Sequence, residues 1–165
     1  MSPRALVAVG AAIAAAAVAV PVVAQPGGAG RTITFRELDK GSRFVYIDNP
    51  PRNKPHRRPV LSVGDQSVVA IPLADAGGRI GGLRAICVIT KNAPASDVGF
   101  VKGHPYCTGA FVLTSGTLFV QATDVGGKVT RGAIVGGTGA YAGARGTFTS
   151  TSTKTGANDV VTLLP

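Results

Sequence analysis

Stretches in which apolar and polar residues alternate follow one another along most of the chain, and turn residues separate them. Alternation over about 4–8 residues is typical of a β-strand with one buried face. The expected strands cover residues 32–39, 42–48, 60–73, 79–91, 106–114, 117–124 and 128–135, and two more open at Thr147 and Asp159. Because closure removes exposed strand edges, the pattern predicts an all-β domain in the form of a closed barrel rather than a sandwich.

The connections between these strands are rich in proline and glycine. Pro50, Pro51, Pro55 and Pro59 remove backbone donors from residues 49–59, which excludes regular structure there. Shorter turns are expected at residues 75–78, 115–116 and 125–127, and a longer loop at residues 92–104. The spacing of these turns suits a meander of antiparallel strands.

A glycine-rich segment, AIVGGTGAYAGARGTFTS, runs from Ala133 to Ser150. Its glycines of interest are Gly136, Gly137, Gly139 and Gly143. Glycines after a strand also suit the pyrophosphate of a dinucleotide, but that site requires a helix to follow. Residues 146–153 (GTFTSTST) are instead rich in threonine and alternate like a strand. The glycines therefore predict a barrel corner between two strands.

The first 24 residues have the pattern of a secretory signal peptide. Arg4 precedes an apolar run over residues 5–20, and Val22-Val23-Ala24 places small residues at a cleavage site. Pro21 interrupts the run, which argues against a transmembrane anchor. The expected organisation is a signal peptide (1–24), a flexible lead-in (25–31) and one domain (32–165), in a secreted or envelope protein with no stable membrane insertion after cleavage.

The chain is basic, with 17 Lys and Arg against 8 Asp and Glu and a net charge of +9. An excess of this kind suits nucleic acid, an anionic envelope or simple solubility. The most basic run, residues 52–58 (RNKPHRR), has no aromatic residue on which a base could stack. We therefore expect a solvated loop there and no nucleic-acid partner.

Two cysteines are equally distant in sequence from the centre of the loop at residues 92–104. An antiparallel pairing of the flanking strands would set Cys87 opposite Cys107, which permits a disulfide in an oxidising compartment. A reactive thiol is the alternative. His56 and His104 are isolated in proline-containing loops, so neither a metal site nor a cofactor is expected.

Motifs in a fixed order resemble a known family. The order is Val63-Gly64-Asp65, Asp75, Arg79-Ile80-Gly81, Ile86-Cys87-Val88, Gly116-Thr117-Leu118, Gly136-Gly137-Thr138-Gly139, Tyr141 and Gly146. This series closely resembles the allene oxide cyclase barrel, and the glycine corner with Ala144-Arg145-Gly146 is similar to the dirigent proteins. The resemblance spans about residues 32–164, and the Ala, Gly, Arg and Val bias suggests a bacterial genome. It implies an eight-stranded antiparallel closed β-barrel, often trimeric, with an apolar cavity open at one end.

Carrying the family's functional residues over gives a candidate site. The cavity cysteine falls on Cys87, the carboxylate and its neighbouring amide on Thr34 and Arg36, and the water-holding asparagine on Ile71. Three of these four positions therefore differ from the family. The same alignment turns Thr32, Thr34 and Arg36 toward the cavity and Ile33, Phe35 and Glu37 outward, where they could serve an oligomer contact.

Two functions follow from the resemblance. In the first, the barrel binds a small hydrophobic or phenolic compound and directs a cyclisation or coupling, as the family does by confining reactive intermediates. Arg36 and Asp65 would set the cavity's polarity, Tyr106 and Cys87 would line it, and Asp65 or a ligand carboxylate would pair with an inward Arg36. In the second, the barrel binds a ligand or has a structural role in the envelope without turnover, which the three altered positions favour.

Overall fold

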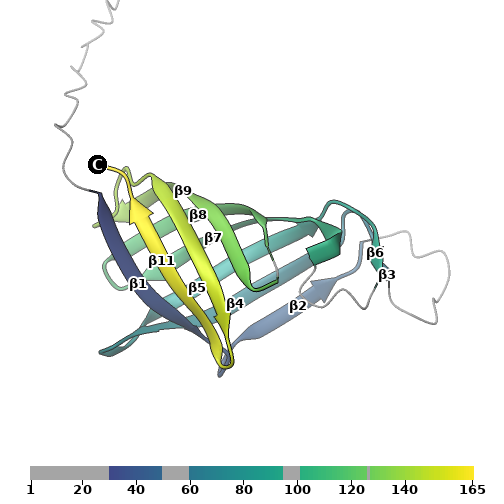
Figure 1. Ribbon diagram of the computed structural model, residues 1–165, viewed down its shortest axis with the longest axis horizontal. Coiled ribbons are helices and arrows are strands. Elements are labelled where there is room, and N and C mark those ends of the chain that lie inside the picture. The colour runs from purple at the N-terminus through teal and green to yellow at the C-terminus, as the bar shows by residue number, and fades with distance from the viewer. Residues whose placement is uncertain (1–29, 50–59, 95–100, 126) are drawn as a thin grey trace, which may run out of the picture.

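The computed structural model describes residues 30–49, 60–94, 101–125 and 127–165. Within these ranges the chain forms β-strands and one short 3-10 helix (Figure 1). The elements are β1 (Arg31–Leu38), β2 (Arg43–Ile47), β3 (Val60–Leu61), β4 (Gln66–Asp75), β5 (Gly78–Ile89), β6 (Ala93–Pro94), η1 (Val101–Gly103), β7 (Pro105–Leu113), β8 (Gly116–Asp124), β9 (Val129–Gly139), β10 (Gly146–Thr153) and β11 (Gly156–Leu163). The described residues contain no helix that is long and apolar enough to cross a bilayer.

Eight of the strands close into an antiparallel barrel. Their order is β1-β11-β10-β9-β8-β7-β5-β4, and β4 pairs back to β1. The prediction of an all-β, eight-stranded closed barrel is therefore confirmed. Each connection between consecutive strands from β7 to β11 is a short turn, so the sequence neighbours become sheet neighbours.

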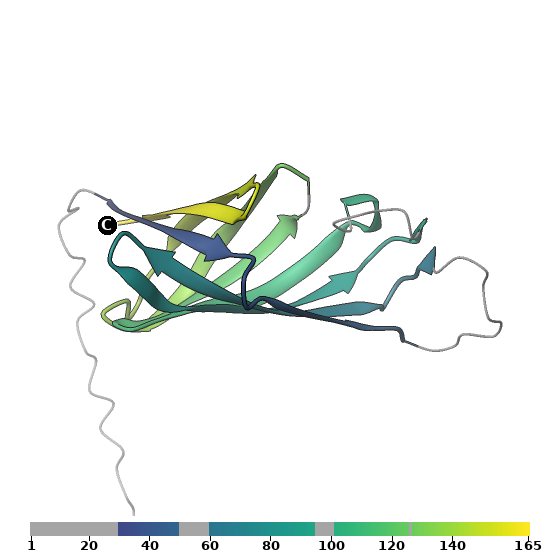
Figure 2. The same cartoon turned by 90° about the horizontal axis from the view of Figure 1, so that it is seen from below.

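The barrel is closed at one end and flares at the other. β1 pairs with β4 only at Arg36↔Ala74 and Glu37↔Leu73, and β2 then continues along β4 from Arg43↔Ala70 to Ile47↔Gln66. Figure 2 shows the sheet spreading away from β1 and β11 toward β2. The chain thus leaves the barrel wall at the end of β1, and an opening remains beside it.

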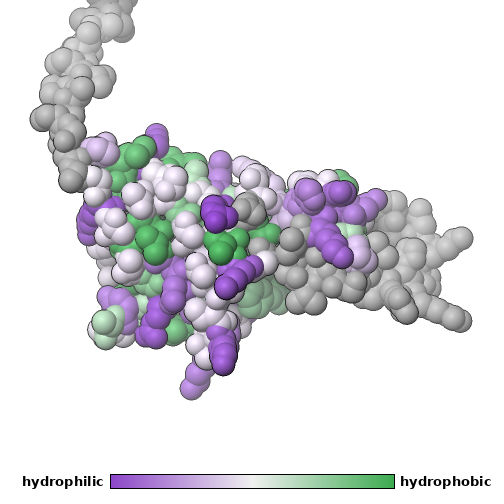
Figure 3. All heavy atoms as spheres, in the orientation of Figure 1, coloured by the Kyte–Doolittle hydropathy of each residue, from purple (hydrophilic) through white to green (hydrophobic). Residues whose placement is uncertain are grey.

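The closed end holds the main apolar core. Phe35, Leu73, Phe111, Leu118 and Val161 are among its buried residues. Phe111 packs edge-to-face against Phe35, at 5.0 Å between ring centroids, and against Phe148, at 5.5 Å. On the outer surface, apolar and polar residues are interspersed over the face formed by β1, β11 and β10 (Figure 3). The stability of the barrel therefore comes mainly from its interior.

The glycine corner lies later in the chain than expected. β9 does not end at Val135 but continues to Gly139, with Gly136 opposite Phe119 and Gly137 opposite Leu118. A register shift between Phe119 and Val120 bends the strand pair at this point. A Cβ on Gly137 would lie 2.2 Å from the Tyr141 carbonyl oxygen, so glycine is required for the turn to pack against the strand. The turn itself contains Gly143, at φ +77°.

Other boundaries also differ from the expected ones. The single strand expected at residues 60–73 is two strands, β3 and β4, separated by a turn at residues 62–65. The last strand begins at Gly156 rather than Asp159, and Arg31, expected in the lead-in, pairs with Leu163 in β1. The expected signal peptide and most of the lead-in lie outside the described residues, as do residues 52–58.

The disulfide prediction is confirmed. Cys87 and Cys107 are directly paired in the β5–β7 ladder, with their Cα atoms 4.0 Å apart, and their sulfur atoms are bonded. The described residues include no free cysteine, so the alternative of a reactive thiol at Cys87 is not supported. Cross-linking two residues separated by 20 in sequence stabilises the fold by about 3 kcal/mol in the loop-entropy account.

Candidate functional site

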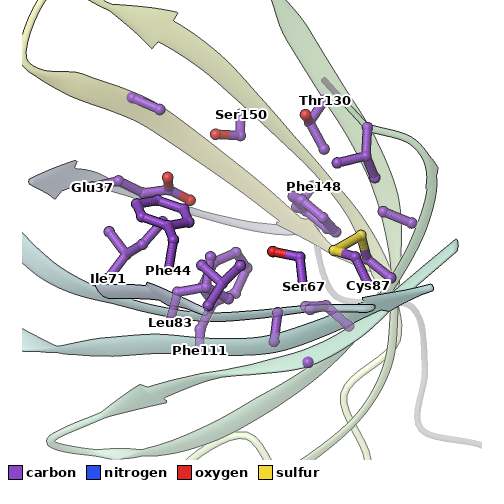
Figure 4. A pocket seen from close by; sticks show the side chains of 18 of the residues that line it. Glu37, Phe44, Ser67, Ile71, Leu83, Cys87, Phe111, Thr130, Phe148 and Ser150 are labelled. Atoms are coloured by element: carbon purple, nitrogen blue, oxygen red, sulfur yellow. A yellow bond between two sulfur atoms is a disulfide. The ribbon is translucent and has the colours of Figure 1, made fainter. Parts of the chain in front are cut away.

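A cavity of about 320 Å³ lies inside the flared part of the barrel. Phe111 and Phe148 of the core form its floor, and Ile71, Leu83 and the disulfide contribute to its walls (Figure 4). Exposed residues among its lining, including Asp39 and Phe44, mark the end at which it opens. Its size suits one small organic ligand rather than a polymer.

Aromatic and aliphatic side chains make up half of the lining residues. Phe44 differs from the other apolar residues of the lining, because its side chain is 65% exposed although it lines the cavity. It comes from β2, where the sheet flares, and its ring lies beside Glu37 in the close-up (Figure 4). A ligand in the cavity would cover part of this ring, which gives the site an apolar contact at its mouth.

Polar groups are few and lie at separate places in the cavity. Glu37 and Asp39 contribute carboxyl groups. The hydroxyl groups come from Ser67, Thr108, Thr130, Ser150 and Ser152. Figure 4 shows the carboxyl group of Glu37 within the cavity, close to Phe44 and Ile71. A small number of polar groups in an apolar pocket is the arrangement that orients a ligand.

A second carboxyl group lies next to Glu37 on the inner face of the wall. Glu37 is opposite Ala157 in the β1–β11 ladder, and Asp159, two residues further along β11, is opposite Phe35. Side chains in this diagonal relation share one face of a sheet. Asp159 is 1% exposed, and neither of its carboxyl oxygens makes a hydrogen bond of ordinary geometry with a described residue.

Both carboxyl groups hold their protons more tightly than usual. Burial, together with the negative charges of Asp159 and Asp39, raises the pKa of Glu37 from 4.5 to about 8. Burial raises the pKa of Asp159 by more than the nearby Ser150 hydroxyl lowers it, so that this pKa rises from 3.8 to about 6. The pair therefore holds a proton at neutral pH and presents both a proton donor and a proton acceptor.

The predicted orientation of β1 is wrong. Phe35 is buried in the core and Glu37 lines the cavity, whereas Thr34 and Arg36 are exposed on the outer surface. Successive side chains of a strand point to opposite faces, so an error of one residue reverses the whole strand. The resemblance placed the family's first-strand carboxylate on Thr34, but this chain places a carboxylate in the cavity at Glu37.

Asp65 is buried outside the cavity lining and has a different environment. It accepts hydrogen bonds from the Tyr46 hydroxyl and from the backbone N–H groups of Ser62, at 2.7 Å, and Asn49, at 3.1 Å. Burial raises the pKa of Asp65, but these hydrogen bonds lower it by more, so it remains below its ordinary value. Asp65 therefore joins β2 to the turn before β4 and does not contact Arg36, which is on the outer face.

The remaining candidates are divided between the cavity and the surface. Ile71 and Cys87 line the cavity, Cys87 as half of the disulfide. Tyr106 is 39% exposed and is absent from the lining. Tyr141 is buried and its hydroxyl accepts a hydrogen bond from Ser115 at 2.9 Å. His104 is exposed, and the described residues include no group of three or more potential ligands placed to hold a metal ion.

The sequence contained a weak signal for the acid pair. Glu37 ends an alternating strand, and Asp159 interrupts the apolar positions Ala157, Val161 and Leu163 of the last strand. A carboxylate at an apolar position of an alternating strand is a candidate for burial. Because the last strand was expected to start at Asp159, this residue was not recognised as an inward-facing position within a strand.

Solved structures with the same fold include a pyocyanin demethylase, with a TM-score of 0.59, 24% sequence identity, and coverage of 81% of this chain and 99% of that one. The pterocarpan synthase dirigent protein GePTS1 aligns with a TM-score of 0.53 and 19% identity over 88% of this chain and 92% of its own. No protein-family model and no curated protein sequence matches the chain. The chain is thus a dirigent-like barrel in fold.

Proposed function

We propose that the protein binds a small aromatic, phenolic compound in the barrel cavity and catalyses a proton transfer that rearranges or cyclises it. The observation that carries this proposal is the pair of carboxyl groups on the inner face of the wall: Glu37, which is half-buried and lines the largely apolar cavity, and Asp159, which is fully buried next to it. Buried carboxyl groups destabilise a fold, and they are concentrated at functional sites. The two solved barrels are named for a demethylation of pyocyanin and a pterocarpan synthesis, which agrees with a small-molecule site.

The two carboxyl groups would have different roles. Glu37 retains its proton at neutral pH because burial and two neighbouring negative charges raise its pKa to about 8, so it acts as the general acid. Asp159, with its pKa raised to about 6, is largely ionised at pH 7 and acts as the general base. In one step, the Ser150 hydroxyl, which lines the cavity opposite Asp159 in the β10–β11 ladder, accepts the phenolic proton and passes its own to Asp159, while Glu37 donates its proton to a ring carbon or an accepting oxygen of the ligand.

The apolar walls would contribute through orientation and exclusion of water. Phe111 and Phe148 form a floor on which an aromatic ring packs, and Phe44 would cover the ligand from the mouth. A ligand held in one orientation presents one atom to Glu37 and another to Ser150, which selects a single product. The family's chemistry, cyclisation or guided coupling, requires this kind of confinement.

Hydrogen–deuterium exchange of 2-naphthol tests the proposal. Exchange at the ring carbon next to the hydroxyl requires protonation of that carbon and loss of the O–H proton, the two transfers assigned to Glu37 and Asp159. We expect the protein to accelerate this exchange in D2O, followed by proton NMR, and Glu37→Gln to reduce the rate by at least about 100-fold. Asp75→Asn, at an exposed turn carboxylate, is the matched control and should retain the full rate.

Fluorescence titration of 2-naphthol separates binding from catalysis. Glu37→Gln keeps the shape of the cavity, so we expect it to bind the naphthol within a few-fold of the parent affinity. Binding without accelerated exchange in the parent protein would contradict the catalytic proposal and support the alternative, a ligand-binding barrel without turnover. A failure to bind would contradict both.

We further propose that the protein is secreted and that it forms a homo-oligomer. The outer face of the flared sheet carries Val45, Val68 and Ile86 in one row across β2, β4 and β5. Val45 and Ile86 are 56% and 44% exposed, and contact with further copies of the chain, as a homo-trimer, would cover them. The contact predicted through Ile33, Phe35 and Glu37 is wrong, because these side chains face inward.

A further inference from the structure

A groove of about 570 Å³ crosses the outer surface of the barrel, on the opposite side of the wall from the cavity. The side chains on either side of Ala70 and Arg84 in sequence, Val69, Ile71, Leu83 and Ala85, line the cavity. Alternation therefore places Ala70 and Arg84 on the outer face, and both are exposed. The groove is thus on the other side of the wall from the site of the proposed function, and Ile71 and Leu83 border both.

All the charged residues that line this groove are arginines. Arg43, Arg79 and Arg84 line it, and its lining contains no acidic residue. Arg43 and Arg84 flank Ala70 in one cross-strand row. Arg36 and Arg79 flank Ala74 in a second row, four residues along β4, so that Arg36 adds a fourth charge beside the groove.

These four guanidinium groups are not neutralised by the described part of the chain. None of them forms an ion pair there, and the carboxylate of Asp75, the last residue of β4, accepts a hydrogen bond from the N–H of Gly77 at 2.8 Å. Like charges held close together repel one another, which destabilises the fold slightly. An anionic partner would remove this repulsion and gain charge-assisted hydrogen bonds.

The shape and composition of the groove favour one kind of anion. Ala70, Pro72, Gly81 and Gly82 form a floor of small side chains over which an extended chain of sugar rings can lie. The lining includes no aromatic residue, and single-stranded nucleic acids depend on aromatic stacking. The floor is recessed between arginines, whereas a lipid surface would meet protruding side chains. Guanidinium groups bind carboxylate and sulfate oxygens in a bidentate manner.

We propose that this groove binds an acidic polysaccharide, with Arg43 and Arg84 holding one anionic group and Arg36 and Arg79 holding the next. The rows are about 13 Å apart along β4, which suits a polymer with anionic groups at intervals rather than a single small anion. Such polymers are components of the anionic envelope that a basic, exported protein would encounter. The barrel would be retained on that polymer while its cavity remains open.

Fluorescence anisotropy with labelled oligogalacturonate tests the proposal on the purified full-length protein. We expect Arg43→Gln combined with Arg84→Gln to weaken binding by about 10- to 100-fold, because each lost charge-assisted contact has a large effect. Arg145→Gln combined with Lys154→Gln removes the same charge elsewhere and should change the affinity less than threefold. Naphthol binding in the cavity should be unchanged in both double variants, which keeps this test independent of the proposed function.

Three results would overturn the proposal. Equal weakening by the two double variants would show that the net charge alone attracts the glycan. Tighter binding of a single-stranded DNA oligonucleotide, or of phosphatidylserine vesicles, through the same arginines would assign the groove to a different partner. Equal competition by inorganic phosphate and by unlabelled oligogalacturonate would show that a single small anion suffices.

Discussion

Glu37→Gln is expected to raise the free energy of unfolding above pH 8 by about 2–4 kcal/mol relative to the parent protein. The pKa of Glu37 is about 8 in the folded state and 4.5 when the group is exposed. Between these values the folded protein retains a proton that the unfolded chain has released, so the parent loses stability as the pH rises from 4.5 to 8. Glutamine is neutral throughout and removes this loss.

Urea unfolding at a series of pH values measures this effect. The parent and Glu37→Gln should have similar stabilities near pH 4 and diverge toward pH 8, while Asp75→Asn should keep the parent's decline because Glu37 is still present. Asp159, whose pKa is raised to about 6, adds to the decline between pH 3.8 and 6 in all three proteins. Curves for the parent and Glu37→Gln that remain parallel across this range would show that Glu37 is not buried as an acid.

Phe111→Ala is expected to lower the free energy of unfolding by about 3–5 kcal/mol. Phe111 is 1% exposed, and it joins the core to the cavity floor through edge-to-face contacts with Phe35 and Phe148. Its removal leaves a space that the rigid barrel walls cannot fill by collapse. The cavity should also lose affinity for 2-naphthol, because the floor of the site is part of the same ring cluster.

Phe119→Ala is the matched control for this change. Phe119 is on the neighbouring strand β8 but is 42% exposed on the outer face, and its truncation should alter the unfolding free energy by less than about 1 kcal/mol. Phe111→Leu, which retains most of the volume, should recover part of the stability. Equal losses in Phe111→Ala and Phe119→Ala would contradict the position assigned to the core.

The sequence was sufficient to predict the strands and their closure because alternation and turn residues act locally. The pairing of Cys87 with Cys107 was also predictable, since two residues equally distant from a loop centre are opposite in an antiparallel pair. The glycines were harder to interpret. Two adjacent glycines were expected to end the strand, but Gly136 and Gly137 remain paired with β8. The missing side chain of Gly137 is what allows the close approach of Tyr141.

The candidate site was harder to predict from the sequence than the fold, and the acid pair shows the physical reason. Glu37 and Asp159 are separated by most of the chain, and only the register of β1 with β11 brings them to one face. Which residues of β1 face inward depends on that register, and a shift of one residue reverses every side chain. The family's residue pattern placed the cavity on Thr34 and Arg36 and therefore missed both carboxyl groups.

A carbon-13 NMR titration of the side-chain carboxyl groups tests the central claim most directly. With labelled glutamate and aspartate, the protein has a single glutamate signal, because Glu37 is the only glutamate in the chain. The account predicts that this signal titrates near pH 8 and that the Asp159 signal, assigned by its loss in Asp159→Asn, titrates near pH 6. Titration of Glu37 near pH 4.5 would contradict the account, because the cavity would then contain an ordinary solvated carboxylate and no proton donor at neutral pH.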